Sequence, residues 1–301
     1  MNKKENIKAY LTWIAICIIW GTTYLAIRIG VEDLPPLLFA GLRWLIAGPI
    51  LFSILRLKKY ALPKKEDIIP LSIIGLSLLG IGNGLVVFAE QWVPSGLTAL
   101  LITTVPFWIV GLESISQKEY KFNTLIIIGL LLGFVGVALI FGSDIDKLFD
   151  PSYLGGIIGL MIAEFGWSAG TIYSKYKKIN LHPLMSASVQ MTIAGFVMTL
   201  TGLILGEGST FHFTDESFGA FMYLVIIGSL IGYASYIYAI AHLPVSLVST
   251  YAYVNPIIAL FLGWLILGEE FTLIIIVSAI IILIGVGAVK KGSEKLIKSS
   301  K

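Results

Sequence analysis

Two related stretches decide the fold of this chain. Residues 82–119 read GNGLVVFAEQWVPSGLTALLITTVPFWIVGLESISQKE, and residues 232–269 read GYASYIYAIAHLPVSLVSTYAYVNPIIALFLGWLILGE. Four residues recur at a constant offset of 150 positions: Gly82 and Gly232, Pro94 and Pro244, Pro106 and Pro256, Glu119 and Glu269. Each stretch has the pattern of one apolar helix, a short turn and a second helix interrupted by proline. The chain therefore contains an internal repeat.

The composition requires a lipid environment. Of 301 residues, 57% are hydrophobic and 13% are charged, which is unlike a soluble domain. A bilayer core of roughly 30 Å is crossed by about 20 apolar residues in a helix. Ten such segments predict an all-α membrane protein with ten transmembrane helices: 9–30, 36–56, 68–91, 94–116, 122–142, 154–175, 183–206, 217–241, 245–267 and 271–289. The short loops leave no room for a soluble catalytic or nucleotide-binding domain.

The positive charges predict the orientation. With ten crossings, 18 of the 21 lysines and arginines fall on the side that holds both chain ends, including a basic tail at 290–301. Positive charge accumulates on the cytoplasmic side, so both ends are expected in the cytoplasm of a multipass inner-membrane protein. This topology explains each lysine cluster, and no nucleic-acid partner is expected.

The repeat divides the chain into two halves of five helices, residues 9–142 and 154–289. Because five is odd, the second half must enter the membrane from the opposite side, which gives an inverted-topology repeat. Two such halves can exchange conformations around a site at the membrane midplane, which is alternating access. The other interpretation of the repeat is a duplicated scaffold without transport.

Several motifs carry a resemblance to a known family. They are WGTTY at 20–24, RIGVE at 28–32, PP at 35–36, AGLR at 40–43, GNG at 82–84, AE at 89–90, VPSG at 93–96, WS at 167–168 and YAYVNP at 251–256. Their order and spacing resemble the EamA-domain branch of the drug/metabolite transporter superfamily, most closely its YedA-type bacterial permeases. The resemblance covers residues 12–289. It implies two five-helix EamA repeats around a central cavity lined mainly by helices one, three, four, six, eight and nine, and export or facilitated passage of amino acids, related metabolites or drugs.

Five ionisable residues lie inside the predicted spans, where a charge costs about 2.5 to 3.5 kcal/mol on insertion scales: Arg28, Arg43, Glu90, Glu113 and Glu164. Glu164 is near the midplane and shares a helix face with Trp167 and Thr171. This face is expected to line the cavity, with Glu164 binding a substrate amine or carrying a proton. The alternative is a neutral carboxyl that is hydrogen-bonded to a neighbouring helix.

The other four ionisable residues could form a gate, a clamp, an anion site or a solvated charge. Trp20, Tyr24 and Arg28 share a face of helix one, and Arg28 is expected to pair with Glu90 as an outer gate or as a fixed clamp. Asn83 lies deeper than Glu90 on nearly the same face. Arg43 either binds an anionic group or caps the backbone of a kinked helix. Glu113 is expected to be a solvated charge at the cytoplasmic end of helix four.

Aromatic side chains and prolines complete the candidate site. Four tyrosines and an asparagine in helices eight and nine would serve as cavity walls or as ordinary packing residues: Tyr233, Tyr236, Tyr251, Tyr253 and Asn255. Pro106 and Pro256 interrupt helices four and nine at matching depths and predict hinges or packing kinks. Gly129, Gly133, Gly285 and Gly287 predict close helix contacts or a dimer face, and the oligomeric state stays open.

The competing functions are a multipass enzyme acting on lipids or isoprenoids, a passive channel, and sensing without transport. Three scattered histidines and the single Cys17 predict no metal site, and no cofactor is expected. No phosphate-binding loop of the GxxxxGK[ST] type occurs, so ATP is not the driver. The expected partners are a small-molecule substrate and membrane lipid, with proton antiport and facilitated diffusion as the two candidate driving modes.

Overall fold

The computed structural model describes residues 3–93, 95–116, 123–140, 142, 150–262, 265 and 272–299. Pro94, Glu119, Phe122, Leu267, Glu269 and Phe271, which enter the predicted repeat or the predicted span ends, lie outside these ranges. The α-helices in the described ranges are α1 (Lys3–Asp33), α2 (Pro36–Leu57), α3 (Lys65–Gly75), α4 (Gly84–Ala89), α5 (Ser95–Ile102), α6 (Val105–Ser116), α7 (Thr124–Ile140), α8 (Leu154–Tyr176), α9 (Pro183–Ile204), α10 (Asp215–Tyr223), α11 (Ala234–His242), α12 (Val245–Val248), α13 (Tyr251–Leu262) and α14 (Leu273–Ser299).

The described helices confirm an all-α membrane protein. Eight segments are long and apolar enough to cross a bilayer: Glu5–Asp33, Pro36–Leu57, Lys65–Ala89, Thr98–Ser116, Pro151–Tyr176, Pro183–Ile204, Asp215–His242 and Leu273–Lys295. Two shorter apolar segments, Thr124–Ile140 and Val245–Ile258, coincide with the fifth and ninth predicted spans. Large apolar side chains such as Leu25 and Ile158 are more than half exposed, as expected of a surface that faces lipid.

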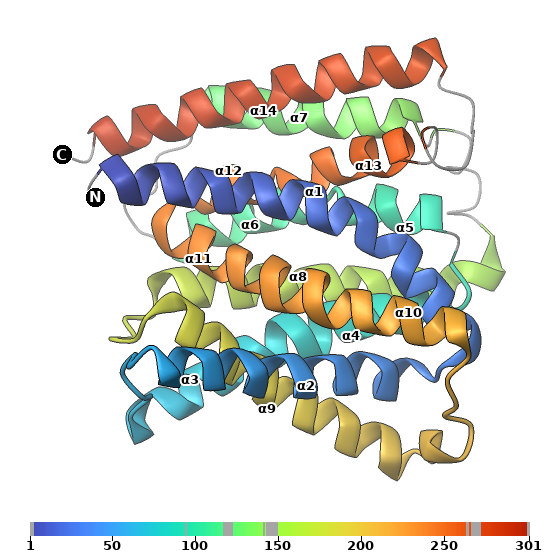
Figure 1. The fold of residues 1–301 in the computed structure, drawn as a ribbon. Helices are drawn as coiled ribbons and strands as arrows, with labels where there is room; N and C mark the ends of the chain where they lie inside the picture. The colour runs from blue at the N-terminus through green and yellow to red at the C-terminus, as the bar shows by residue number, and fades with distance from the viewer. Residues whose placement is uncertain are drawn as a thin grey trace.

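The helices form a bundle whose first and last helices share one end. The N-terminal end of α1 and the C-terminal end of α14 lie at the same end of the bundle (Figure 1). Helix α2 packs along α9 on one side, and α7 packs along α14 on the other. Between these pairs lie α1, which contacts α13, α10 and α11, and α8, which contacts α3, α4 and α6. The described part of the 290–301 tail continues α14 as helix.

The internal repeat is visible in the local structure of both halves. The third and eighth spans each contain a π-helical segment, Leu76–Asn83 between α3 and α4 and Leu224–Tyr233 between α10 and α11. A π-helical segment widens the helix and is frequent at functional sites. The packing also repeats, because α1 lies against α13 of the ninth span and α8 lies against α6 of the fourth. The two π-helical segments therefore occupy corresponding places in the two halves.

Glycines hold the outer helix pairs close together. A Cβ atom on Gly129 would lie 2.5 Å from the Gly285 carbonyl oxygen, and one on Gly285 would lie 2.9 Å from the backbone nitrogen of Gly133. Since these distances are too short for any side chain, α7 and α14 approach through bare backbone. The two predicted glycine motifs thus meet within one chain, although Gly287 has no such neighbour within 4 Å.

The two proline-containing spans break at different places. The fourth span is interrupted at Thr103 and Thr104, and Pro106 lies in the first turn of α6. The ninth span is interrupted at Ser249 and Thr250, and Pro256 lies inside α13. Proline is tolerated in the first turn, where its missing N–H would have no helical partner. The two breaks thus lie at different distances from the two prolines, and the role of each proline as a hinge or a packing kink stays a prediction.

Candidate functional site

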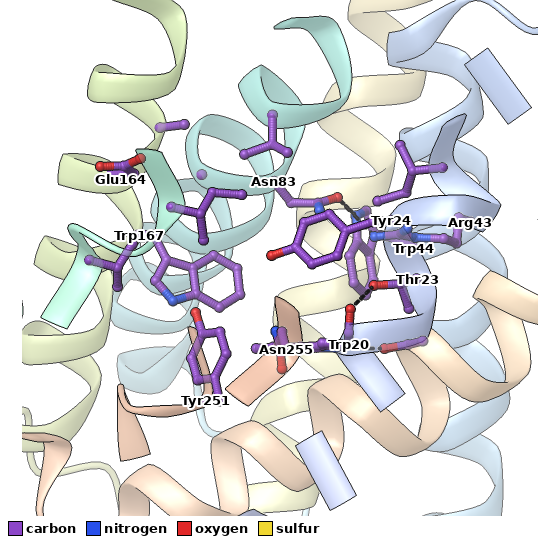
Figure 2. Close-up of a pocket in the computed structure, with 17 residues that line it drawn as sticks. Trp20, Thr23, Tyr24, Arg43, Trp44, Asn83, Glu164, Trp167, Tyr251 and Asn255 are labelled. Carbon is purple, nitrogen blue, oxygen red and sulfur yellow. Dashed lines mark hydrogen bonds between the residues drawn. The ribbon is translucent and has the colours of Figure 1, made fainter. Parts of the chain in front are cut away.

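A pocket lies between the two halves of the bundle. Its lining residues come from α1, α2, α4, α5, α6, α8, α13 and both π-helical segments. They are Trp20, Thr23, Tyr24, Ile27, Arg43, Trp44, Gly82, Asn83, Val86, Ile102, Val105, Ala163, Glu164, Trp167, Gly228, Tyr251 and Asn255 (Figure 2). All six spans named by the resemblance contribute, and the second span adds Arg43 and Trp44.

Glu164 lies at one end of this pocket, on α8. Glu164 is 2% exposed, and the Thr104 hydroxyl donates a hydrogen bond to its Oε2. The other carboxyl oxygen, Oε1, is buried and makes no hydrogen bond of normal geometry, although the Trp108 side chain also interacts with this carboxyl group. Thr104 reaches Glu164 because it lies in the break between α5 and α6. Thr104 was not among the residues predicted from the sequence, although the proline two residues later was a signal of a broken helix.

Arg43 lies at the opposite end of the pocket (Figure 2). It is 3% exposed, and its Nη2 donates to Oδ1 of Asn83 at 2.8 Å. Trp44 Nε1 donates to the same oxygen at 3.3 Å, and the guanidinium lies 4.0 Å from the centre of the Trp44 ring. The Arg43 Nε has no hydrogen-bond partner. The observed hydrogen-bond partner is thus a side-chain amide, in contrast to the hypothesis of backbone capping.

An aromatic cluster, formed by Trp20, Trp167, Tyr236 and Tyr251, closes one side of the pocket. The Trp20 ring centre lies 5.5 Å from Trp167, 5.2 Å from Tyr236 and 4.9 Å from Tyr251. Tilted and edge-to-face pairs at such distances are favourable beyond their buried area. The cluster therefore joins α1, α8, α11 and α13 at their crossing.

The repeated glycines explain how the two tryptophans fit. A Cβ atom on Gly82 would lie 3.0 Å from the Trp167 ring, and one on Gly232 would lie 2.8 Å from Trp20 Nε1. The tryptophan in the first span of each half thus packs directly against a glycine in the third span of the opposite half. This contact accounts physically for one of the four residues that recur at the 150-residue offset.

Several predicted residues lie outside the pocket lining. The Tyr236 hydroxyl bonds to the Thr171 hydroxyl at 2.5 Å, and both groups are buried behind the pocket wall. Tyr233 donates to Gln190 Oε1 of α9 at 2.7 Å. Tyr253 packs against Gly133 of α7, and its hydroxyl is buried without a partner. Tyr251 and Asn255, by contrast, line the pocket.

Asn255 links α13 to the first span. In the orientation of its amide that satisfies the surrounding groups, Nδ2 donates to the carbonyl oxygens of Tyr251 and Cys17, both at 2.9 Å. Asn255 is 1% exposed, so these bonds lie in the interior. The bond to Cys17 couples the ninth span to the first beside the pocket.

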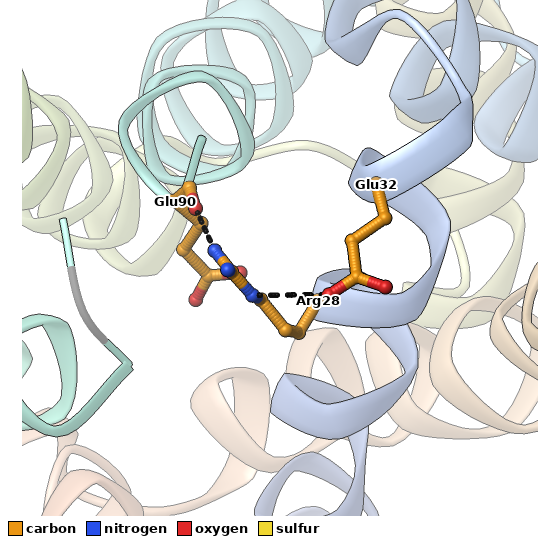
Figure 3. Close-up of polar contacts among 3 residues, drawn as sticks. All are labelled: Arg28, Glu32 and Glu90. Carbon is orange, nitrogen blue, oxygen red and sulfur yellow. Dashed lines mark hydrogen bonds and ion pairs between the residues drawn. The ribbon is translucent and has the colours of Figure 1, made fainter. Parts of the chain in front are cut away.

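Arg28 and Glu90 meet, but the carboxyl group of Glu90 takes no part in the hydrogen bond. Nη1 of Arg28 donates to the backbone carbonyl oxygen of Glu90 at 2.9 Å, and its Nε lies 3.6 Å from Oε1 of Glu32 (Figure 3). Both carboxyl oxygens of Glu90 are buried and have no hydrogen-bond partner. The sequence correctly brought these two residues together, but helical spacing could not determine that the main chain makes the contact.

Glu113 corrects another expectation. It is 7% exposed rather than solvated, and the Tyr176 hydroxyl donates a hydrogen bond to its Oε1. Nearby, Lys175 Nζ donates to the carbonyl oxygens of Ile240 and Leu243, each at 2.8 Å. The end of α8 covers this part of α6, and counting residues along helix four could not reveal that cover.

The described residues contain no group of three or more histidine, cysteine, aspartate or glutamate side chains that could hold a metal ion. The pocket instead combines aromatic walls with buried polar groups that lack partners. Such a pocket suits the reversible binding of an organic molecule, because apolar walls bury its surface and a few polar groups orient it.

Comparisons with known proteins identify what this chain is similar to. The model of the EamA-like transporter family matches it twice, over residues 7–142 and 154–289. It is 34% identical over 273 residues to the "uncharacterized inner membrane transporter YedA" of Escherichia coli strain K12, across 89% of this chain and 86% of that protein. It is 24% identical over 307 residues to a "probable amino-acid metabolite efflux pump" of Salmonella typhimurium, across 95% of this chain and 94% of that protein. A crystal structure that is 18% identical in sequence matches the fold with a TM-score of 0.79, across 96% of this chain and 98% of that one.

Proposed function

The chain belongs to the EamA-like transporter family, and on that premise we propose that it is a secondary transporter that binds a small organic metabolite in the pocket between its two halves. Family membership confirms the resemblance seen in the sequence and makes the chain a membrane transporter with two EamA repeats. The observation that supports the binding site most directly is a pocket lined by both repeats, with buried polar groups that lack partners. The comparisons give no support to the lipid-enzyme alternative.

The proposed topology has ten spans in two inverted halves, residues 9–142 and 154–289, with both ends in the cytoplasm and the tail at 290–301 on that side. Three observations support it: α1 begins where α14 ends, at one end of the bundle; the two halves have corresponding π-helical segments; and most positive charges fall on one predicted side.

Reporter fusions test this topology. A reporter at either chain end is expected to show cytoplasmic activity, and one fused after residue 142 is expected to show activity on the outer side, because five crossings precede it. Activity of both the Gly142 and the C-terminal fusions on the same side would contradict the inverted arrangement.

The gates follow from that orientation. Arg28, Glu32 and Glu90 would lie on the outer side of the pocket, and the aromatic cluster would close its cytoplasmic side. The Arg28 side chain is 47% exposed and is held by one main-chain hydrogen bond and a long ion pair, so the contact is easily broken. We therefore favour a gate over a fixed clamp. The breaks at Thr103–Thr104 and Ser249–Thr250, near Pro106 and Pro256, are the proposed hinges.

The substrate class is proposed from chemistry and from the name of the Salmonella relative. Amino acids or related compounds carry the charged groups that Glu164 and Arg43 can pair with, and the aromatic walls would bury the rest. The efflux named for that relative supports export as the direction of transport.

Flux measurements in proteoliposomes test the function. Purified protein is expected to carry at least one member of a panel of labelled amino acids and aromatic amines, and Trp167→Ala should lower that flux roughly tenfold by removing an aromatic wall. Trp92→Ala is the matched control, because Trp92 is 53% exposed and contacts Phe88 away from the pocket. Equal losses in both variants would contradict the assignment of the pocket, and absence of flux for the entire panel would contradict the function.

A further inference from the structure

The pocket has an arginine at one end and a glutamate at the other. Arg43 lies at one end and Glu164 at the other, with Tyr24, Trp20 and Trp167 between them (Figure 2). No ion pair joins the two residues: the ion pairs found in the described part of the chain are those of Arg28 with Glu32 and of Lys64 with Glu66.

Each end keeps an unused hydrogen-bonding atom. Nε of Arg43 and Oε1 of Glu164 are both buried without a partner, on residues that are 97% and 98% buried. A buried polar atom without a hydrogen-bond partner is costly, because the solvation it loses is not replaced. Two such atoms on residues that line one pocket point to a ligand that supplies the missing partners.

The chemistry of the two groups defines those partners. A guanidinium prefers a carboxylate, since its planar fork matches the two oxygens. Oε1 of Glu164 can accept a hydrogen bond from an ammonium group, while its Oε2 stays with Thr104. Asn83 and Trp44 hold the Arg43 side chain in place, so its position does not depend on the ligand.

The rest of the pocket lining is mostly apolar and aromatic. It includes Val86, Ile102 and Val105 and the rings of Trp20 and Trp167, and its further polar groups include those of Thr23, Tyr24 and Asn255. A ligand that reaches both ends must therefore place an apolar skeleton here and carry its charges at its two extremities. An α-amino acid bears both charged groups on one carbon atom and can satisfy only one end directly.

Resting on the proposed transport function, we propose that the pocket selects substrates with an ammonium group at one end and a carboxylate at the other, joined by an extended apolar skeleton. Arg43 binds the carboxylate, and Glu164 binds the ammonium. Omega-amino acids have this chemistry. Monovalent amines and carboxylates engage one end and bind less tightly.

Two pairs of isomers test the proposal on the wild-type chain. 6-Aminohexanoate and norleucine have the same atoms, as do 8-aminooctanoate and 2-aminooctanoate, and only the separation of the charges differs. Calorimetric titration of the purified full-length protein is expected to show that at least one omega-isomer binds roughly tenfold tighter than its α-isomer, and tighter than hexylamine or hexanoate. Equal or tighter binding of both α-isomers, or no binding of either omega-isomer, overturns the proposal.

Two substitutions test which charged group of the ligand binds at each end of the pocket. Arg43→Gln is expected to weaken binding of the preferred omega-isomer roughly tenfold and to leave hexylamine unchanged, and Arg43→Lys should restore part of the affinity. Glu164→Gln is expected to weaken the same isomer and to leave hexanoate unchanged. Loss of the single-charge ligand together with the omega-isomer in either variant contradicts the assignment.

The proposal and the transport function fail in different ways. A wild-type protein that carries members of the flux panel but shows no isomer preference retains its function and loses this specificity. A protein that carries neither any member of the flux panel nor 6-aminohexanoate fails as the proposed transporter.

Discussion

The Gly195→Leu substitution is expected to prevent the chain from forming a stable bundle. A Cβ atom at position 195 of α9 would lie 2.3 Å from the backbone nitrogen of Leu45 and 2.8 Å from the carbonyl carbon of Trp44. Neither atom belongs to a side chain that could move aside, so α2 and α9 would have to separate. Because Arg43 and Trp44 are on this part of α2, the pocket would be displaced as well. Overpacking of this kind costs about 3 kcal/mol or more.

Thermal unfolding and size-exclusion chromatography in detergent measure this effect. The variant is expected to yield little monodisperse protein, or protein with a clearly lowered Tm. Gly159→Leu is the matched control, because nothing lies within 4 Å of a Cβ atom at Gly159 in α8. Both changes exchange a helical glycine for leucine within an apolar span. Similar Tm values for the two variants would show that the contact between α2 and α9 is looser than the structure indicates.

The Glu164→Gln substitution is expected to lower the flux of amine-bearing substrates roughly tenfold or more, because a hydrogen bond to a charged group in a buried site is lost. Glutamine has the same shape and keeps an oxygen that can accept from Thr104, so the break between α5 and α6 should remain intact. The change thus removes the negative charge and the titratable proton with little disturbance of the fold. Flux into proteoliposomes, with and without an imposed pH gradient, measures both consequences.

Glu113→Gln is the control for this experiment. Glu113 is also buried and also accepts a hydrogen bond from a hydroxyl group, that of Tyr176, but it does not line the pocket. Its substitution is expected to leave flux near the wild-type rate. Gradient-driven flux that is insensitive to Glu164→Gln would exclude Glu164 as the proton carrier and would turn attention to Glu90, whose carboxyl group has no hydrogen-bond partner. Wild-type flux that ignores the gradient would favour facilitated diffusion.

The sequence by itself determined the class of protein and much of the candidate site. Long apolar segments can satisfy their backbone groups in lipid only as helices, so composition and length predict an all-α membrane bundle. The recurrence of Gly82 as Gly232 and of Pro106 as Pro256 revealed the duplication, which the family model independently matches. Charged residues are rare in the spans because they are costly, and this rarity drew attention to Arg43 and Glu164, which both line the pocket.

Only the tertiary structure decided which partner each side chain meets. Helical spacing places Tyr253 and Asn255 on faces of one helix, but it does not say that α7 covers Tyr253 while Asn255 borders the pocket. The same holds for Glu113, which α8 buries, and for Arg28, which bonds to a backbone carbonyl of the third span. An α-helix makes its backbone hydrogen bonds within itself, so its sequence alone shows which side chains share one face of the helix. The neighbour on that face comes from helices distant in the chain, and their packing is a property of the whole bundle.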